Sequence, residues 1–268
     1  MKSPKEIALE KYFLKLIPSG GSSERLARLL VDDDEVQLLQ DHANSVSIKR
    51  LGYNDHGPVH MRQVAVNAVR MLELLRASGI TTSLEAEQIG TYEDSLDAVM
   101  LAAFLHDVGM SIGRQDHEIL SVIIARPIME RLLVQVFPDE PNRRVIIAST
   151  ATEGIVGHMA NRRIHSLEAG IILIADGCDM EKGRARIPMT INTTPKVGDI
   201  HKYSSNAIDS VTIGHGKKRP IRIDVKMSSD VGFFQVEEVL LQKINMSPVK
   251  PYIELYASVQ DQDVKQYV

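Results

Sequence analysis

Residues 96–109 read LDAVMLAAFLHDVG, and this stretch decides the fold. Apolar side chains cover almost the whole circumference of the helix that it predicts, which is typical of a helix buried on all sides. Gly109 is a natural residue for the end of such a helix. Asp107 would then carry a buried charge, and an unpaired buried charge costs several kcal/mol. A partner must compensate it, and a hydrogen bond from His106 or a salt bridge to an arginine would suffice.

Helical spacing of apolar residues predicts further helices on both sides of this segment. Pro58 suits the first turn of the next upstream helix, which Asn54 or Asp55 could cap. Downstream, Asp116 could cap a helix that Pro127 should bend or end. The predicted helices comprise two within residues 7–47, separated by a break at 18–21, and single helices at 58–77, 142–157 and 166–179.

The pattern changes after about Pro188. Residues 221–227 and 253–259 alternate strictly between apolar and polar side chains, as strands with one solvated face do. Residues 207–213 form a weaker strand, and apolar residues between 233 and 244 recur at helical spacing. We therefore expect an α+β protein, with an all-helical domain at 1–188 and a small β-β-α-β domain at 189–268.

Composition restricts the class of protein. Lys and Arg number 31 against 35 for Asp and Glu, a net charge of −4, so we expect no broad nucleic-acid-binding surface. A small anionic substrate at a local basic pocket is compatible with this charge. The single cysteine, Cys178, cannot form an intrachain disulfide. No apolar run is long enough to span a membrane and no signal peptide is evident, so we expect a cytoplasmic protein.

Other polar residues stand on apolar helices in the same way as His106 and Asp107. His60 lies one turn into the helix at 58–77, and Asp176 ends the apolar run AGIILIAD at 169–176. Two imidazoles and two carboxylates on three buried helices make a usable site for a divalent cation. Hydrogen bonding among these groups without a metal is the alternative.

These residues resemble a known signature. His60, the segment LHDVG at 105–109 and the segment IAD at 174–176 resemble the H…HD…D pattern of the HD-domain superfamily of metal-dependent phosphohydrolases. The segment NDHGPVH at 54–60 is similar to the usual lead-in, and the resemblance covers about residues 40–185. It implies a helical domain that hydrolyses phosphate esters of nucleotides or related compounds, with His60, His106, Asp107 and Asp176 as metal ligands.

Two further histidines resemble those of two-metal members. The segment DHEILS at 116–121 is similar to the helix that follows their HD pair, and His158 precedes the last ligand helix as their additional histidine does. The resemblance implies that His117 and His158 hold a second metal, with Asp107 as the bridge. In a one-metal protein, His117 and Glu118 would instead be catalytic or structural groups near the phosphate. The metal, one ion or two, could be Mn, Fe, Mg, Zn, Ni or Co.

One position departs from the family pattern. Many members continue the HD pair with Gly-Lys, whereas Met110 follows Gly109 here, so a phosphate contact is missing. Basic residues nearby could replace it, although each could equally be a solvated surface group. The candidate substrate-binding residues are Arg114, Lys182, Arg184 and Arg186.

The expected mechanism needs no protein nucleophile, because a bound metal lowers the pKa of a coordinated water. We expect Asp107, His117 and Glu118 to be the catalytic groups, the last two by moving protons. Cys178 is expected to pack in the core. Of the remaining histidines, His56 should support the site or be exposed. The four expected at the surface are His42, His165, His201 and His215.

Two other functions are compatible with this sequence. Some relatives with two irons activate oxygen instead of hydrolysing phosphate. A non-catalytic, metal-stabilised nucleotide sensor is the second alternative, with the β-β-α-β segment transmitting binding or forming a homodimer. The main expectation remains an enzyme with a small phosphorylated substrate and no membrane partner.

Overall fold

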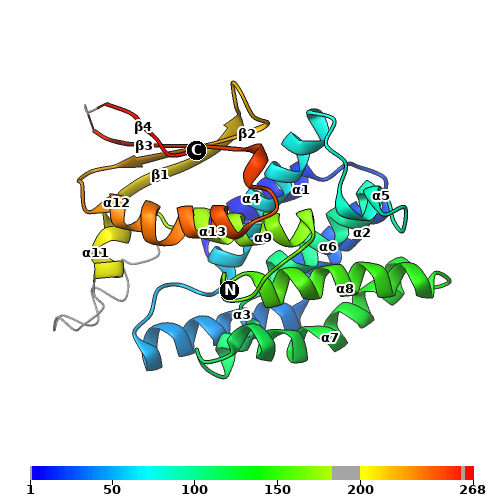
Figure 1. Cartoon of the computed structure of the whole chain (residues 1–268). Helices are drawn as coiled ribbons and strands as arrows, with labels where there is room; N and C mark the ends of the chain where they lie inside the picture. Colours follow the sequence, from blue (N-terminus) through cyan, green and yellow to red (C-terminus); the bar gives the residue numbers. More distant parts are fainter. Residues whose placement is uncertain (1, 183–199, 261–262) are drawn as a thin grey trace.

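The computed structural model describes residues 2–182, 200–260 and 263–268, without the side chains of 200–202. Helices make up most of it, and a small sheet lies on one side of the helical part (Figure 1), so the α+β prediction is confirmed. The helices before residue 183 are α1 (Pro4–Leu16), α2 (Ser22–Asp32), α3 (Asp34–Ser45), α4 (Pro58–Ala77), α5 (Ser83–Ala86), α6 (Tyr92–Leu105), α7 (His117–Val136), α8 (Pro141–Gly157) and α9 (Leu167–Cys178).

The C-terminal segment has the predicted β-β-α-β order with small additions. Its described residues form a four-stranded sheet of order β1-β2-β3-β4, in which β2 and β3 are parallel and the other neighbours antiparallel. A helix at 232–246 makes the crossover that a parallel pair requires. The elements are α11 (Ile200–Asn206), β1 (Ile208–His215), β2 (Ile221–Met227), α12 (Gly232–Gln235), a π-helical stretch (Val236–Leu240), α13 (Leu241–Met246), β3 (Ile253–Val259) and β4 (Lys265–Gln266).

Helix α6 is the buried centre of the molecule. Thr91 caps its start, accepting a hydrogen bond from the backbone N–H of Asp94 while the Asp94 side chain accepts from that of Thr91. Every residue from Tyr92 to Leu105 except Glu93 is buried, and the helix packs against α2, α4, α8 and α9. Its C-terminal end therefore delivers His106 and Asp107 into the protein interior.

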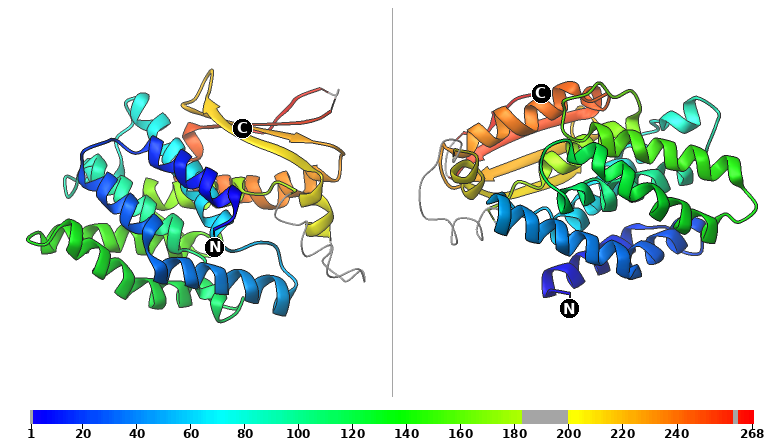
Figure 2. Two further views of the ribbon diagram at one scale, coloured as in Figure 1. Left: turned by 180° about the vertical axis from the view of Figure 1, so that it is seen from behind. Right: turned by 90° about the horizontal axis from the view of Figure 1, so that it is seen from below.

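The sheet shares a hydrophobic core with the helices. One face of β2 is fully buried, with Ile221 and Ile223 completely inaccessible to solvent. Helix α4 packs against β1 and β2, while α9 packs against the helix at 232–246 (Figures 1 and 2). Buried side chains from both parts belong to one continuous apolar cluster. The predicted domain boundary at 188/189 lies outside the described residues.

The sequence prediction was wrong at three helix boundaries. Gly109 does not end the central helix, because α6 stops at Leu105 and Gly109 lies in the following 3-10 turn, Val108–Ser111. Residues 7–47 form parts of three helices rather than two, because Asp33 has an extended backbone and its side chain accepts a hydrogen bond from the N–H of Val36 (3.0 Å), which starts α3. Helix α7 continues through Pro127 to Val136. Pro127 is exposed, and the residue four positions earlier, Ile123, is 65% exposed, so the missing hydrogen bond falls on the solvent side.

The predicted caps before α4 and α7 also differ in detail. Gly57 is the N-cap of α4, and the Asp55 side chain accepts the N–H of Gly57 at 2.8 Å instead of capping the helix directly. Asp116 does occupy the N-cap of α7, but with a left-handed backbone and no side-chain cap hydrogen bond. Both helix starts are therefore fixed by loop packing rather than by a capping side chain.

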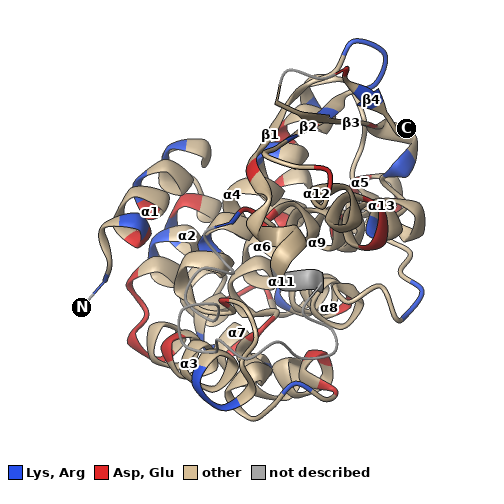
Figure 3. Ribbon diagram, turned by 90° about the vertical axis from the view of Figure 1, so that its left-hand side faces the viewer, with Lys and Arg blue, Asp and Glu red and all other residues tan. Residues whose placement is uncertain are grey.

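Charge is mixed over the helical surface. Figure 3 shows Lys and Arg interspersed with Asp and Glu, and a gathering of positive charge at the turn between β1 and β2. Within the described ranges, no helix has the length and apolar character needed to cross a lipid bilayer.

Candidate metal centre

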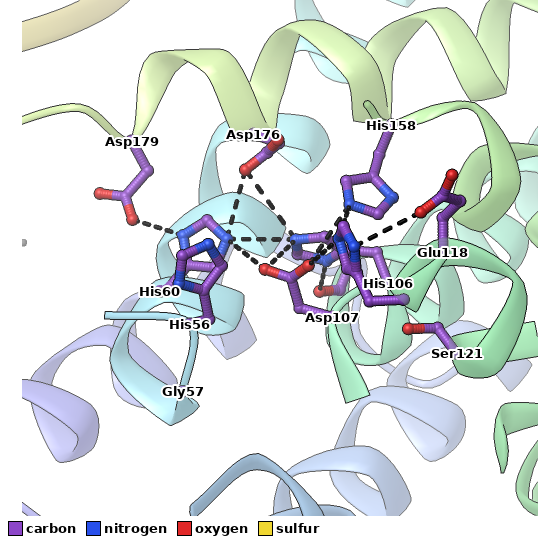
Figure 4. A network of polar contacts seen from close by, with 12 residues as sticks. His56, Gly57, His60, His106, Asp107, Glu118, Ser121, His158, Asp176 and Asp179 are labelled. Carbon is purple, nitrogen blue, oxygen red and sulfur yellow. Dashed lines mark hydrogen bonds and ion pairs between the residues drawn. The ribbon is translucent and has the colours of Figure 1, made fainter. Parts of the chain in front are cut away.

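The six residues predicted as metal ligands meet at one place. His60 lies in the first turn of α4, and Asp176 in the last turn of α9, so distant segments supply them. Figure 4 shows His60, His106, His158 and Asp176 around Asp107, and His117 contacts the same aspartate. The four histidines are the most deeply buried, and none is more than 1% exposed: His60, His106, His117 and His158.

Four of these residues form the first group. The Nε2 atoms of His60 and His106 lie 3.1 Å apart. Asp107 Oδ2 is 3.3 Å from the first of these nitrogens and 3.4 Å from the second. Asp176 Oδ1 completes the group, 3.2 Å from His60 Nε2. The atoms of His60, His106 and Asp176 are close enough to hold one metal ion together.

The second group uses the other oxygen of the same aspartate. The Nε2 atoms of His117 and His158 lie 3.1 Å apart. Asp107 Oδ1 is 3.2 Å from the first and 3.3 Å from the second. Asp107 therefore faces one pair of imidazoles with each carboxylate oxygen, which is the arrangement of a bridging ligand.

Hydrogen bonds on the outer side of each ring determine where its proton lies. Nδ1 of His106 contacts the carbonyl oxygen of Ala103 at 2.9 Å, and the Nδ1 atoms of His117 and His158 likewise contact backbone carbonyls at 2.9 and 2.6 Å. A carbonyl can only accept, so each Nδ1 must carry the hydrogen. In a neutral ring, Nε2 is then an unprotonated lone pair that points inward.

Inward lone pairs at these distances form a site that suits a cation. Two unprotonated nitrogens 3.1 Å apart cannot share a hydrogen bond, and they repel each other. Asp107 Oδ1 is buried and has no hydrogen-bond partner in the described part of the chain. Imidazole nitrogens and carboxylate oxygens are ligands for divalent metals, with the second ring nitrogen held by an outer partner. The residues present therefore fit one or two divalent ions.

The electrostatics of the cluster favour ionised carboxylates. Burial would raise the pKa of Asp107, but His106, His117 and His158 hold this pKa well below its usual range. Burial also opposes ionisation of Asp176, whose pKa the Lys243 ammonium and His60 nevertheless keep well below the ordinary value. Burial lowers the pKa of His158. These directions favour ionised Asp107 and Asp176 and a neutral His158, which are the forms that bind metals.

Outer contacts hold the ligands in place, and sequence reasoning missed two of them. Asp179 Oδ2 lies 2.6 Å from His60 Nδ1, so a carboxylate supports this ring where carbonyls support the others. Its place three residues after Asp176 is a weak signal that could have suggested this role. Lys243 donates a hydrogen bond to Asp176 from the C-terminal segment, and no spacing in the sequence indicates that contact.

Glu118 lies behind His117 rather than on the inner side of the cluster. Its Oε2 is 3.4 Å from His117 Nδ1, and its Oε1 accepts a hydrogen bond from Asn161 at 2.7 Å. Burial opposes ionisation, yet Asn161 and the imidazoles lower the pKa of Glu118 below its ordinary value. The position suits an ionised group that orients His117.

Two of the four predicted substrate-binding residues, Arg114 and Lys182, lie within the described residues. Of these two, only Arg114 is next to the cluster. The Arg114 carbonyl holds His117, and its guanidinium lies 3.6 Å from the sulfur of Met159 and 5.9 Å from the centre of the Tyr53 ring. The Lys182 side chain is 58% exposed and pairs with Asp209 on β1. Arg184 and Arg186 lie outside the described residues.

The remaining histidines lie mostly where they were expected. The ring of His56 is 5.9 Å from that of His60, and its Nδ1 contacts Asn54 O and Ser47 Oγ at 2.7 and 2.9 Å, so it supports the loop before α4. The exposed ones are His42, His165 and His215, while the His201 side chain lies outside the description. Cys178 is buried, and burial raises the pKa of its thiol.

Comparison with known proteins identifies the family. Residues 59–181 match the family model of the HD domain. An uncharacterized protein of Methanocaldococcus jannaschii is 38% identical over 231 residues, which cover 86% of this chain and 87% of that protein. No solved structure matches the chain. The matched segment contains all six residues of the cluster, and the chain belongs to the HD-domain superfamily, whose members are largely metal-dependent phosphohydrolases.

Proposed function

We propose that this protein is a metal-dependent phosphohydrolase that cleaves a phosphate ester of a nucleotide or another small phosphorylated compound. The observation that carries the proposal is the paired arrangement of inward Nε2 atoms around Asp107. Bound divalent ions would supply a water of lowered pKa and polarise a phosphoryl oxygen. The ligands would be His60, His106 and Asp176 on one side, His117 and His158 on the other, with Asp107 shared.

The protein contributes fixed geometry to this chemistry. Carbonyl oxygens and Asp179 hold the Nδ1 side of the imidazoles, so the rings need not reorganise when the site is loaded. Glu118 orients His117 from outside, as its contact with Nδ1 supports. A role for His117 or Glu118 in proton transfer stays a prediction from the sequence.

We infer that the substrate phosphate approaches on the side of Arg114. This residue adjoins both histidines of the second group, because its carbonyl holds His117 and its side chain contacts Met159, the neighbour of His158. A guanidinium can bind two phosphate oxygens at once. It is therefore the best replacement for the lysine that the family pattern lacks at Met110. Arg184 and Arg186 remain candidates for the same role.

Metal analysis combined with a phosphatase screen tests the proposal. Purified protein is expected to contain one or two equivalents of a divalent metal by mass spectrometry. It should also hydrolyse at least one compound among nucleotides, cyclic dinucleotides and simple phosphomonoesters. Asp107→Ala should lose metal, and its activity should fall more than about 100-fold, beyond the effect typical of an outer partner. His215→Ala, at an exposed position, should change neither.

The same experiment separates the other candidate functions. Bound metal with no turnover of any compound would contradict the hydrolase and favour a sensor. Two irons in a mixed-valent state that consume oxygen would favour an oxygenase. A wild-type protein that binds no divalent metal would contradict all three.

A further inference from the structure

A buried lysine from the C-terminal segment reaches the metal centre. Lys243 lies on α13 and is only 8% exposed. Its Nζ donates hydrogen bonds to Asp176 Oδ2 and to the backbone carbonyl oxygen of His158, the latter at 2.7 Å. Asp176 belongs to the first group of ligands and His158 to the second. One ammonium therefore connects the two halves of the cluster from outside.

We propose that Lys243 is a positioning residue of the metal centre, so that the C-terminal β-β-α-β segment is part of the site rather than an independent appendage. The inference rests on the proposed metal-dependent function. Asp176 presents its other oxygen, Oδ1, to His60 at 3.2 Å. Holding Oδ2 fixes the rotation of the carboxylate, and this rotation decides whether Oδ1 points at the ligand cluster.

The contact with His158 acts on the second group. His158 follows the last turn of α8, where backbone carbonyls have no partner within the helix. Lys243 satisfies one of these carbonyls and places positive charge at the C-terminal end of the helix, which is favourable there. The backbone of His158 is thereby held, while its Nδ1 is held by the carbonyl of Ile155 at 2.6 Å.

Helix α9 is shaped to receive this lysine. Gly170 and Gly177 are seven residues apart, which places them on one face of the helix. A Cβ atom at Gly177 would lie 3.0 Å from Lys243 Cδ, and one at Gly170 would lie 2.6 Å from Ser247 Oγ. The missing side chains let the C-terminal helix approach closely enough for Lys243 to reach Asp176.

The energetic cost of this arrangement points to a function beyond packing. Burying an ammonium is unfavourable unless it is paired and hydrogen-bonded, and an apolar side chain of the same size often stabilises a fold equally well. A π-helical stretch, Val236–Leu240, directly precedes α13, and such irregularities are frequent at functional sites. Lys243 also lies on the outer oxygen of Asp176, where its charge does not occupy a ligand position.

Titration with Co²⁺ tests the inference without relying on activity. The variants are Lys243→Met, which keeps the length of the side chain and removes its donors, and Lys250→Met, an exposed lysine on the same segment. Affinity is measured by competition with a chelator, and the ligand field by visible absorption. We expect Lys243→Met to bind Co²⁺ about 10- to 100-fold more weakly, the usual effect of losing an outer partner, with a changed spectrum. Lys250→Met should match the wild type.

The outcomes distinguish this inference from the proposed function. Wild type that binds no divalent metal would overturn both. If the wild type binds metal and Lys243→Met has the same affinity and spectrum, only the role of Lys243 is overturned. Tighter binding by Lys243→Met would also overturn that role, because it would mean that the lysine charge opposes the metal. If circular dichroism shows that Lys243→Met does not fold, Gly177→Ala replaces it, because the added methyl displaces Lys243 without removing its charge. An unchanged spectrum there would equally reject the inference.

Discussion

At the scale of single residues, the inner side of the metal centre could be predicted and the outer side could not. A histidine or aspartate on an otherwise apolar helix requires a partner, and that requirement together with the family resemblance pointed to all six inward groups. The groups behind them are backbone carbonyls, such as that of Ala103, or residues far along the chain, such as Asp179 for His60 and Lys243 for Asp176. The carbonyls lie three residues before each histidine and belong to the local backbone, whereas tertiary packing brings Asp179 to His60 and Lys243 to Asp176.

The same residue-scale reasoning gives a prediction for Asp97, a buried carboxyl group outside the metal centre. It is 0% exposed, and the Ser23 hydroxyl is the polar side chain that faces it. Burial raises its pKa from 3.8 to about 7; a hydrogen bond from Ser23 opposes this rise, and nearby Asp94 adds to it. The folded protein therefore holds this proton more tightly than the unfolded chain does, so the free energy of unfolding falls as pH rises from 4 to 7.

Replacing Asp97 by a side chain that does not titrate should make the free energy of unfolding less dependent on pH. A change in pKa from 3.8 to about 7 corresponds to a loss of ~4 kcal/mol in the free energy of unfolding as the pH rises. Asp97→Asn should lack this part of the loss, so urea unfolding at pH 5 and pH 8 should give a smaller difference for it than for the wild type. Asp139→Asn, at an exposed position, is the control and should behave like the wild type. Equal pH dependence in Asp97→Asn would show that Asp97 ionises freely in the folded state.

At the scale of elements, periodicity located the helices and strands, whereas their boundaries depended on tertiary context. The apolar run at 96–105 gave α6 because a helix buried on all sides has a distinctive composition. The break at Asp33 was missed. Pro127 was given too much weight because its exposure could not be known from the sequence. The short pair β3–β4 adds two residues to the sheet without any alternating pattern to reveal them.

The packing of the turn after α6 against α7 gives a prediction at this scale. Gly109 lies in the 3-10 turn Val108–Ser111, and a Cβ atom there would lie 2.1 Å from the carbonyl oxygen of His117 and 2.6 Å from the backbone nitrogen of Ser121. Neither backbone atom can move without shifting the start of α7. Gly109→Ala should therefore lower the free energy of unfolding by about 1–3 kcal/mol, as overpacking does.

Metal content then reports where the strain falls. Because His117 is the first residue of α7, Gly109→Ala should weaken binding at the second group more than at the first, giving a reduced metal stoichiometry. Gly113→Ala is a matched control, since a Cβ atom there has nothing within 4 Å. Similar stability and metal content in the two variants would show that the turn can shift away from α7 at little cost.

At the scale of the whole molecule, the sequence indicated two kinds of structure but not how they combine. The change from helical to alternating patterns led to a predicted boundary near residue 188, which the structure does not describe. Buried residues of the strands, such as Ile223 and Leu255, nevertheless belong to the same apolar cluster as Leu72 of α4. With Lys243 reaching Asp176, both the core and the metal centre connect the two parts.

A continuous core predicts that the described parts unfold together. Thermal unfolding followed by calorimetry should show one transition with equal calorimetric and van't Hoff enthalpies, both with metal and after treatment with a chelator.

Metal should raise the free energy of unfolding by ~2.7 kcal/mol when its free concentration is 100 times the dissociation constant, because only the folded state assembles ligands from α4, α6, α7, α8 and α9. Asp107→Ala should unfold at the same temperature with and without metal, since it lacks the shared ligand. Two separate transitions, with only the first sensitive to metal, would instead mean that the sheet is an independent unit and that its contact with Asp176 adds nothing to the stability of the centre.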